Sequence, residues 1–184
     1  MNNKQHTIKN SIFFEGIGLH TGTYSKIELI PALPNTGIIF VRKDIPSAPI
    51  IKVDIDTFLN AKNFLRRTSI GKEGIYIHTI EHLMAAFHIL GIDNVYINIW
   101  GEEIPGLDGS SKEFVEEILK VGMEEQDVTR EYIAVNDIIH IEENSASITV
   151  LPYPTLRISY VLKYDNPIIG SEYEEIIIPS EDCI

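Results

Sequence analysis

The sequence predicts an α+β fold: a two-layer sandwich in which a mostly antiparallel sheet carries two helices on one face. Short runs of alternating apolar and polar residues, separated by Gly, Pro and Asn, fill most of the first hundred residues and are typical of strands. Two segments instead carry apolar residues at helical spacing between capping signals. Past residue 127 strand-like runs continue without further helix signals.

The strand pattern is clearest in Tyr24–Ile30. There Lys26 and Glu28 alternate with Ile27 and Leu29, so that one face of the strand is apolar and the other polar. The strands expected in the first part are Thr7–Phe14, Tyr24–Ile30, Gly37–Val41, Ile50–Asp54, Thr68–Ile77 and Val95–Trp100.

Two helices follow from local signals. The first begins after Thr79, a favourable N-cap residue, and ends at Gly91, a favourable residue for a helix C-terminus. The second begins near Ser110, which has capping-box spacing with Glu113, and ends at Gly122. Their apolar faces consist of Leu83, Met84, Phe87 and Leu90 in the first helix, and Phe114, Val115, Ile118 and Leu119 in the second.

The last third of the chain reads differently. Its expected strands are Tyr132–Ile141, Ser147–Leu151, Leu156–Tyr164 and Glu174–Ile178. Strands without helices lack a second layer to cover them. We therefore predict an N-terminal sandwich domain over residues 1–127 and an incomplete second domain, mostly strands, over 128–184.

Composition excludes several classes of partner and location. The net charge of −12 argues against a nucleic-acid partner and against binding to anionic membranes, since both need basic patches. The single cysteine, Cys183, fits a reducing compartment. The N-terminus lacks the apolar region of a signal peptide, and no apolar run has the length of a membrane span. We expect a cytoplasmic protein without a transmembrane segment.

The stretch His78–His82, with sequence HTIEH, matches the H-x-x-E-H pattern of inverted zinc peptidases. That chemistry needs both histidines on one helix face, one turn apart. Here a strand-like run leads into His78 and the helix begins after Thr79, so His78 lies at a strand end and does not project beside His82. The peptidase is therefore the less favoured alternative.

Glu81 and His82 lie in the first turn of the expected helix. The partial positive charge there favours a neutral imidazole, able to bind a metal, and an ionised carboxylate, able to act as a base. The two side chains diverge by about 100° around the helix axis, so one reaches a metal while the other reaches a water. A metal site needs three or four ligands, and this stretch supplies one. An ordinary helix start explains the same two residues.

Four sequence blocks favour a catalytic role for Glu81 and His82 over an ordinary helix start. The blocks are GIGLHTG at 16–22, RRTSI at 66–70, TIEHL at 79–83 with GIDN at 91–94, and IPGLDGS at 104–110. In this order and spacing the chain resembles the N-terminal half of the UDP-3-O-acyl-N-acetylglucosamine deacetylases, zinc hydrolases of lipid A biosynthesis. The resemblance implies that His82 is a Zn²⁺ ligand. It also implies that Glu81 is the general base that activates the water attacking the N-acetyl group of a UDP-sugar lipid.

The same resemblance implies substrate-binding positions at His20, Leu65 and Thr68, around the entrance to the metal. Arg66 and Arg67 depart from the small or thiol residues common there in the family. For His20, a role in stabilising its turn is an equally good interpretation.

Members of this family continue into a second domain of similar fold, which supplies the remaining zinc ligands and a further catalytic histidine. The resemblance therefore implies a deacetylase that is inactive alone. Three interpretations remain open. The chain is one part of a split enzyme completed by a second polypeptide, or it is a truncated product, or it is a non-catalytic relic that serves as a binding module. In each case we expect unusual exposed apolar area, to which the run Ile176–Ile178 contributes.

Overall fold

The computed structural model describes residues 4–60 and 64–178, and Cys183 lies outside them. These residues form two compact units, one ending at Thr129 and the other beginning at Arg130. Two α-helices and several antiparallel sheets make up the described chain, which confirms the predicted α+β class. The domain boundary expected after residue 127 falls inside a strand, and the division into two domains stays a prediction.

The first unit is built on a five-stranded sheet with the order β2-β3-β8-β4-β5. Its strands are β2 (Ile12–Ile17), β3 (Tyr24–Pro31), β8 (Val95–Trp100), β4 (Ile38–Arg42) and β5 (Ile50–Lys52). Neighbouring strands are antiparallel except β4 and β8, which pair in parallel. The alternation predicted for β3 is confirmed, because Ile27 and Leu29 are fully buried whereas Lys26 and Glu28 are half-buried.

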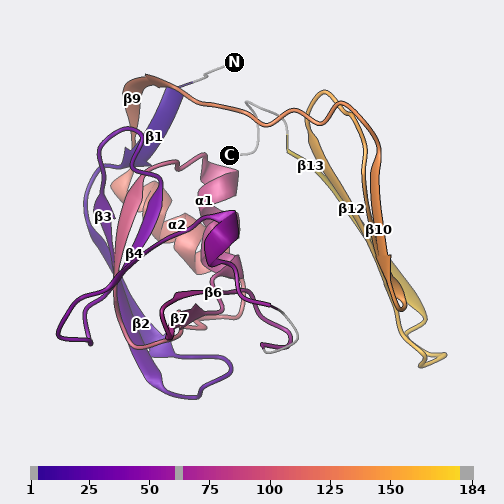
Figure 1. Cartoon of the computed structure of the whole chain (residues 1–184), viewed down its shortest axis with the longest axis horizontal. Helices are drawn as coiled ribbons and strands as arrows, with labels where there is room; N and C mark the ends of the chain where they lie inside the picture. Colours follow the sequence, from indigo (N-terminus) through magenta and orange to yellow (C-terminus); the bar gives the residue numbers. More distant parts are fainter. Residues whose placement is uncertain (1–3, 61–63, 179–184) are drawn as a thin grey trace. The chain divides into compact units, whose positions relative to one another are not determined.

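Helices α1 (Glu81–Leu90) and α2 (Lys112–Val121) cover one face of this sheet (Figure 1). The ring of Phe114 in α2 packs on Phe14 of β2, with 4.9 Å between the ring centroids. Gly91 ends α1 in the left-handed conformation, at φ 67°, as predicted. The helices bury Leu83, Ala86, Phe87, Leu90, Phe114 and Ile118. No helix in the described ranges is long and apolar enough to span a bilayer.

The expected strand Thr7–Phe14 is wrong as a single element. It divides between β2 and a separate strand, β1 (Lys4–Ile8), which pairs antiparallel with β9 (Met123–Thr129). Strand β9 was not predicted, because its sequence, MEEQDVT, is acidic and has little apolar alternation. It forms through backbone pairing with β1, which depends on the fold rather than on local pattern.

The expected strand Thr68–Ile77 is also wrong as a single element. It forms a hairpin of β6 (Ser69–Lys72) and β7 (Ile75–His78). The two turn residues, Glu73 and Gly74, have φ values of 54° and 80°. Positive φ at both central positions is typical of the tight two-residue turn that suits the twist of a β-hairpin. The sequence pattern did not indicate this turn, because apolar residues on both sides of it form what looks like one continuous strand. A short 3₁₀ helix, Ile55–Thr57, precedes this hairpin.

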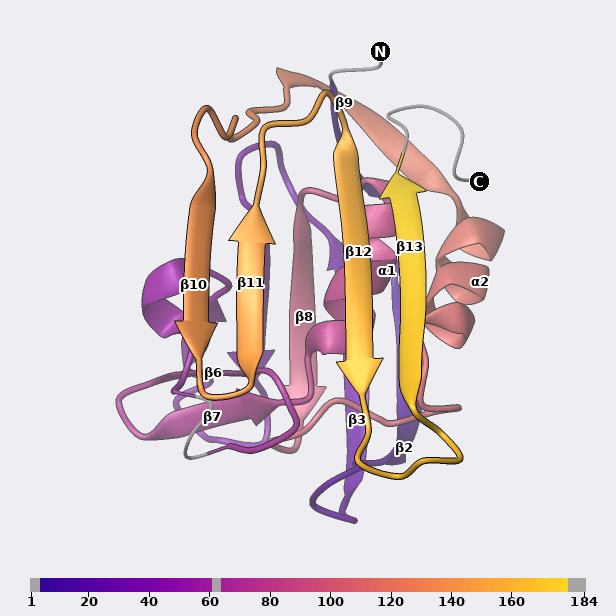
Figure 2. The same cartoon turned by 90° about the vertical axis from the view of Figure 1, so that its right-hand side faces the viewer.

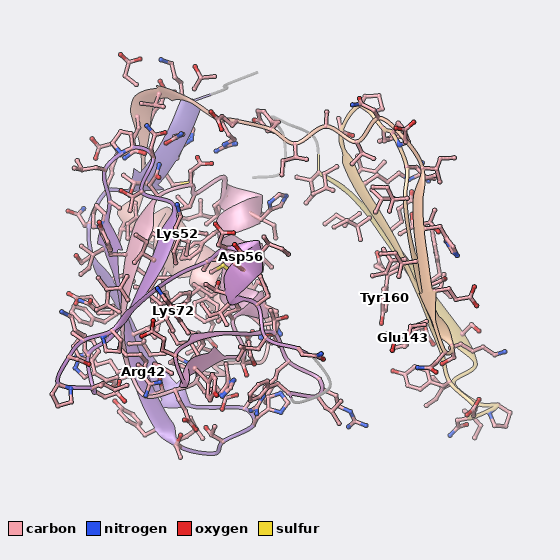
Figure 3. The ribbon with its side chains drawn as sticks, viewed as in Figure 1. Arg42, Lys52, Asp56, Lys72, Glu143 and Tyr160 are labelled. Carbon is pink, nitrogen blue, oxygen red and sulfur yellow. The ribbon has the colours of Figure 1, made fainter. Side chains whose placement is uncertain are left out.

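Arg42 fastens the hairpin to the main sheet from the end of β4 (Figure 3). Its guanidinium donates to the carbonyl of Tyr76 in β7 at 2.7 Å and to both carboxylate oxygens of Asp44 at 2.9 and 2.7 Å. Because Arg42 is 8% exposed, this bidentate pair with Asp44 satisfies a buried charge, and the bond to Tyr76 ties β7 to the end of β4.

The second unit contains β10 (Ile139–Glu143), β11 (Ala146–Val150), β12 (Leu156–Lys163) and β13 (Ser171–Ile178). They form two antiparallel hairpins, and Figure 2 shows the four strands side by side in sequence order. As predicted, the described part of this unit has no helix. The strand expected over Tyr132–Ile141 begins only at Ile139.

Both hairpins are amphipathic. In the β10–β11 hairpin the register places Ile139, Ile141, Ile148 and Val150 on one face. In the β12–β13 hairpin it places Leu156, Ile158, Leu162, Ile176 and Ile178 on one face, together with Glu172, Glu174 and Tyr160, which Figure 3 labels. Ile176 on this face and Ile177 on the opposite face are 45% and 46% exposed, and whether the exposed apolar area is unusual stays a prediction. A two-stranded sheet has no second layer within its own hairpin to bury such side chains.

Candidate active site

The junction between β7 and α1 positions the predicted site residues. Strand β7 ends at His78 and α1 begins at Glu81, so Glu81 and His82 occupy the first helical turn, as predicted. Both side chains are half-buried. The unpaired N–H groups of this turn face the same end of the helix and favour negative charge there. The chemical roles of Glu81 and His82 stay predictions.

Thr79 does not cap α1, and that prediction is wrong. The N-cap position is Ile80, which makes no side-chain capping bond. The Thr79 hydroxyl instead donates to Oε1 of Glu103 at 2.6 Å, and Thr79 has a φ of 59°. A β-branched residue in this left-handed region costs about 1–3 kcal/mol and persists only where its surroundings hold it. The Thr79 hydroxyl therefore donates to the buried carboxylate of Glu103 and does not cap the helix.

Glu81 is held by the loop before β6. Its Oε2 accepts the backbone N–H of Thr68 at 2.9 Å, and the Thr68 carbonyl accepts the N–H of Ile80 at 3.3 Å. These two bonds fix Thr68 against the start of α1. The predicted site residue Thr68 thus contacts Glu81 through its backbone N–H and not through its hydroxyl.

His78 is a core histidine. It is 4% exposed, and its Nδ1 lies 2.8 Å from the hydroxyl of Ser69 on β6. Burial, followed by the positive charge of Arg67, lowers the pKa of His78 below its usual value. It precedes the helix, as predicted, so it does not share a helix face with His82 as the inverted peptidase motif requires.

The other two predicted substrate residues lie in loops. Leu65 is 72% exposed, three residues before Thr68. The His20 side chain is also exposed, but its backbone N–H donates to Oε1 of Glu103 at 2.9 Å. The structure therefore joins His20 to Thr79 through Glu103 and joins Thr68 to Glu81, while Leu65 has no bond to this network among the residues described.

Glu103 was missed by the sequence analysis. It is 1% exposed, and its carboxylate accepts four hydrogen bonds, from the N–H groups of His20 and Thr21 and from the hydroxyls of Thr21 and Thr79. Burial alone would raise the pKa of Glu103, but these hydrogen bonds lower it to about 2. Its partners lie 24 to 83 positions away, so no local pattern identifies them.

We expect Glu103 to make the chain sensitive to acid. Its pKa is about 2 when folded against 4.5 ordinarily, so its contribution to stability is complete above pH 4.5 and disappears as the pH falls towards 2. The shift corresponds to about 3 kcal/mol. Urea unfolding between pH 6 and pH 3 measures it. Glu103→Gln should flatten the pH dependence, whereas Glu102→Gln, at an exposed neighbour, should not. Equal slopes in both variants would contradict the expectation.

A zinc ion in a protein is bound by His, Cys, Asp or Glu side chains that converge on one point. In residues 4–60 and 64–178, no three His, Cys, Asp or Glu side chains come together in a group able to hold a metal. A half-buried imidazole at a helix start suits one position of a tetrahedral site. The described chain therefore offers one candidate position of such a site, His82, and its role as a ligand stays a prediction.

The chain is similar to a known family over almost its whole length. Residues 5–182 match the family model described as LpxC, UDP-3-O-acyl N-acetylglycosamine deacetylase. The deacetylase of Thermodesulfovibrio yellowstonii is 39% identical over 98% of this chain and 60% of its own length. The Haemophilus influenzae deacetylase is 35% identical over 92% of this chain and 55% of its own length.

A fusion protein shows the same similarity. The bifunctional enzyme LpxC/FabZ of Chlorobaculum tepidum is 42% identical over 92% of this chain, which corresponds to 36% of that enzyme. The chain thus spans between 36% and 60% of the length of these curated relatives.

Proposed function

This chain belongs to the UDP-3-O-acyl N-acetylglycosamine deacetylase family, and we propose that it is the part of a zinc-dependent deacetylase that carries the general base and one zinc ligand. The observation that carries the proposal is the first turn of α1, where Glu81 is held by Thr68 and His82 follows directly. The substrate would be a UDP-3-O-acyl-N-acetylglucosamine, the compound named for the deacetylase relatives. The reaction is hydrolysis of its N-acetyl amide in lipid A biosynthesis.

In this proposal Glu81 takes a proton from the water that attacks the acetyl carbonyl. The Thr68 N–H holds one carboxylate oxygen, which orients the other for this transfer. His82 would bind the zinc ion through its imidazole. Zinc, when bound, lowers the pKa of a water and polarises a carbonyl. His20 and Leu65, both exposed near this end of the unit, are the proposed substrate contacts from this chain.

The remaining ligands are proposed to come from residues beyond this chain, because one histidine does not hold catalytic zinc. Either a continuous longer protein or a second polypeptide would supply them, and the relatives are longer than this chain. We propose that the chain alone is inactive. A cytoplasmic location belongs to the same proposal.

A chimera tests this function. The chain replaces the segment that it matches in the Thermodesulfovibrio yellowstonii deacetylase, and acetate release from UDP-3-O-acyl-N-acetylglucosamine is measured with and without a zinc chelator. We expect turnover that is lost on chelation and restored by Zn²⁺, and none from the 184-residue chain alone. The unaltered relative is the positive control. A folded but inactive chimera would favour the non-catalytic alternative, a relic or binding module of the same fold.

A further inference from the structure

The turn from β7 into α1 depends on one buried side chain. Thr79 makes that turn in a left-handed conformation, and its only side-chain hydrogen bond among the described residues goes to Glu103. The helix has no side-chain cap of its own. The contact of Thr79 with Glu103 is thus one of two that hold the start of α1, the other being the bond from the Ile80 N–H to the Thr68 carbonyl.

The same carboxylate holds the turn that contains His20. Oε1 accepts the His20 N–H at 2.9 Å, and Oε2 accepts the N–H and hydroxyl of Thr21 at 2.7 and 2.6 Å. Each oxygen of Glu103 thus accepts two bonds, and Oε1 joins the His20 turn directly to Thr79.

The backbone around Glu103 connects the same two segments. On one side, the carbonyl of Glu102 accepts the N–H of His78 at 2.8 Å, and the His78 carbonyl accepts the N–H of Ile104 at 3.1 Å. On the other side, Gly106 donates to the carbonyl of Ile17 at 3.0 Å. The carboxylate lies between them with 1% exposure for its residue, shielded from competing water.

Gly18 leaves the space that the carboxylate occupies. A Cβ atom at this position would lie 2.4 Å from Oε2 of Glu103 and 2.6 Å from the hydroxyl of Thr21. Both atoms are fixed by hydrogen bonds, so neither moves easily. At Gly16, by comparison, a Cβ would meet its nearest neighbour, Pro105, at an ordinary 3.5 Å. The second glycine of the GIGLHTG block is thus explained by Glu103.

From this geometry we propose that Glu103 is a positioning residue: it fastens the His20 turn to Thr79 and thereby sets where Glu81 and His82 stand. Glu103 touches neither of them in the described structure and acts through Thr79 and the start of α1. Its catalytic consequence rests on the proposed function, whereas its structural consequence does not.

Amide hydrogen exchange on the purified 184-residue chain tests the structural part. The Thr68 N–H donates to Glu81 and so reports whether that carboxylate is in place. In Glu103→Gln we expect the amides of His20, Thr21 and Thr68 to exchange about tenfold faster or more, because the weaker acceptor frees both segments. The Ile97 amide in the centre of β8 should keep its rate, and Glu102→Gln should change none of them.

The Thr68 amide decides between positioning and a purely local role. If His20 and Thr21 exchange faster while Thr68 is unchanged, Glu103 holds only its own turn and the proposal is wrong. Gly18→Ala should reproduce the effect of Glu103→Gln, with Gly16→Ala as the matched control. Should Glu103→Gln fail to fold, Thr79→Val and Thr79→Ser replace it. Valine, which lacks the hydroxyl, should free Thr68 and serine should not, and equal rates would overturn the proposal.

The chimera tests the catalytic part. Glu103→Gln should lower kcat about tenfold or more, because the base is displaced, and should also raise KM, because it frees the turn that carries the proposed substrate contact His20. Thr79→Ser should restore the activity that Thr79→Val loses. Inactivity of the unmutated chimera would defeat the proposed function but leave the exchange result standing. A normal kcat in Glu103→Gln, with Thr68 exchange accelerated, would overturn positioning as a requirement of the reaction.

Discussion

Glu81→Ala is expected to lower kcat of the chimera by about a hundredfold or more, the usual loss when a general base is removed. The substitution removes the carboxylate that Thr68 holds at the start of α1 and leaves the attacking water without a proton acceptor. Because the base acts mainly in the transition state, KM should change much less than kcat. Steady-state kinetics at saturating zinc measures both constants.

Glu113→Ala is the matched control for this experiment. Glu113 is the acidic residue in the first turn of α2, so its removal costs the same kind of helix-dipole interaction without touching the proposed site. Its variant should keep kcat and zinc content. If Glu81→Ala retains activity within threefold of the parent chimera, Glu81 is not the base, and the helix-start interpretation of this residue is correct.

His82→Ala is expected to abolish zinc retention by the chimera. Loss of a residue that merely supports a metal ligand costs about tenfold to a hundredfold in affinity, and loss of the ligand itself should cost more. Metal analysis after gel filtration measures the bound zinc. Activity should disappear with the metal, and high concentrations of Zn²⁺ should restore only part of it.

His88→Ala is the control on the same helix. His88 lies in the last turn of α1 and is exposed, so its removal should leave the zinc content unchanged. If His82→Ala keeps stoichiometric zinc after gel filtration, this chain supplies no ligand at that position. The proposed division of the zinc site between this chain and other residues would then be wrong.

The sequence predicted best those features that local pattern controls. Helix α1 was predicted from its apolar spacing and from Gly91, whose left-handed conformation ends it. The location of Glu81 and His82 in its first turn followed directly from those signals. Strand β3 was equally readable, because a sheet with one buried face imposes a period of two on its residues.

Prediction failed where pairing decides the structure. Strand β9 is acidic and is specified by the backbone of β1, and the turn at Glu73 and Gly74 lies within a continuous strand-like run. Threonine is a residue type favoured at helix N-caps, yet the hydroxyl of Thr79 donates to the carboxylate of Glu103, a stronger acceptor in another segment. For β9 and Thr79 the deciding partner is distant in sequence, whereas the hairpin turn is local but is concealed by the apolar residues on both sides of it.

The sequence by itself determined the family, the α+β class and the adjacency of Glu81 to His82, because motifs, periodicity and helix signals are local properties of the chain. Only the tertiary structure brought Thr68 to Glu81 and placed the Glu103 carboxylate between His20 and Thr79. A buried carboxylate is stable only when several donors converge on it, and here those donors come from segments far apart in sequence. Folding creates that convergence, so no single stretch of the chain contains it.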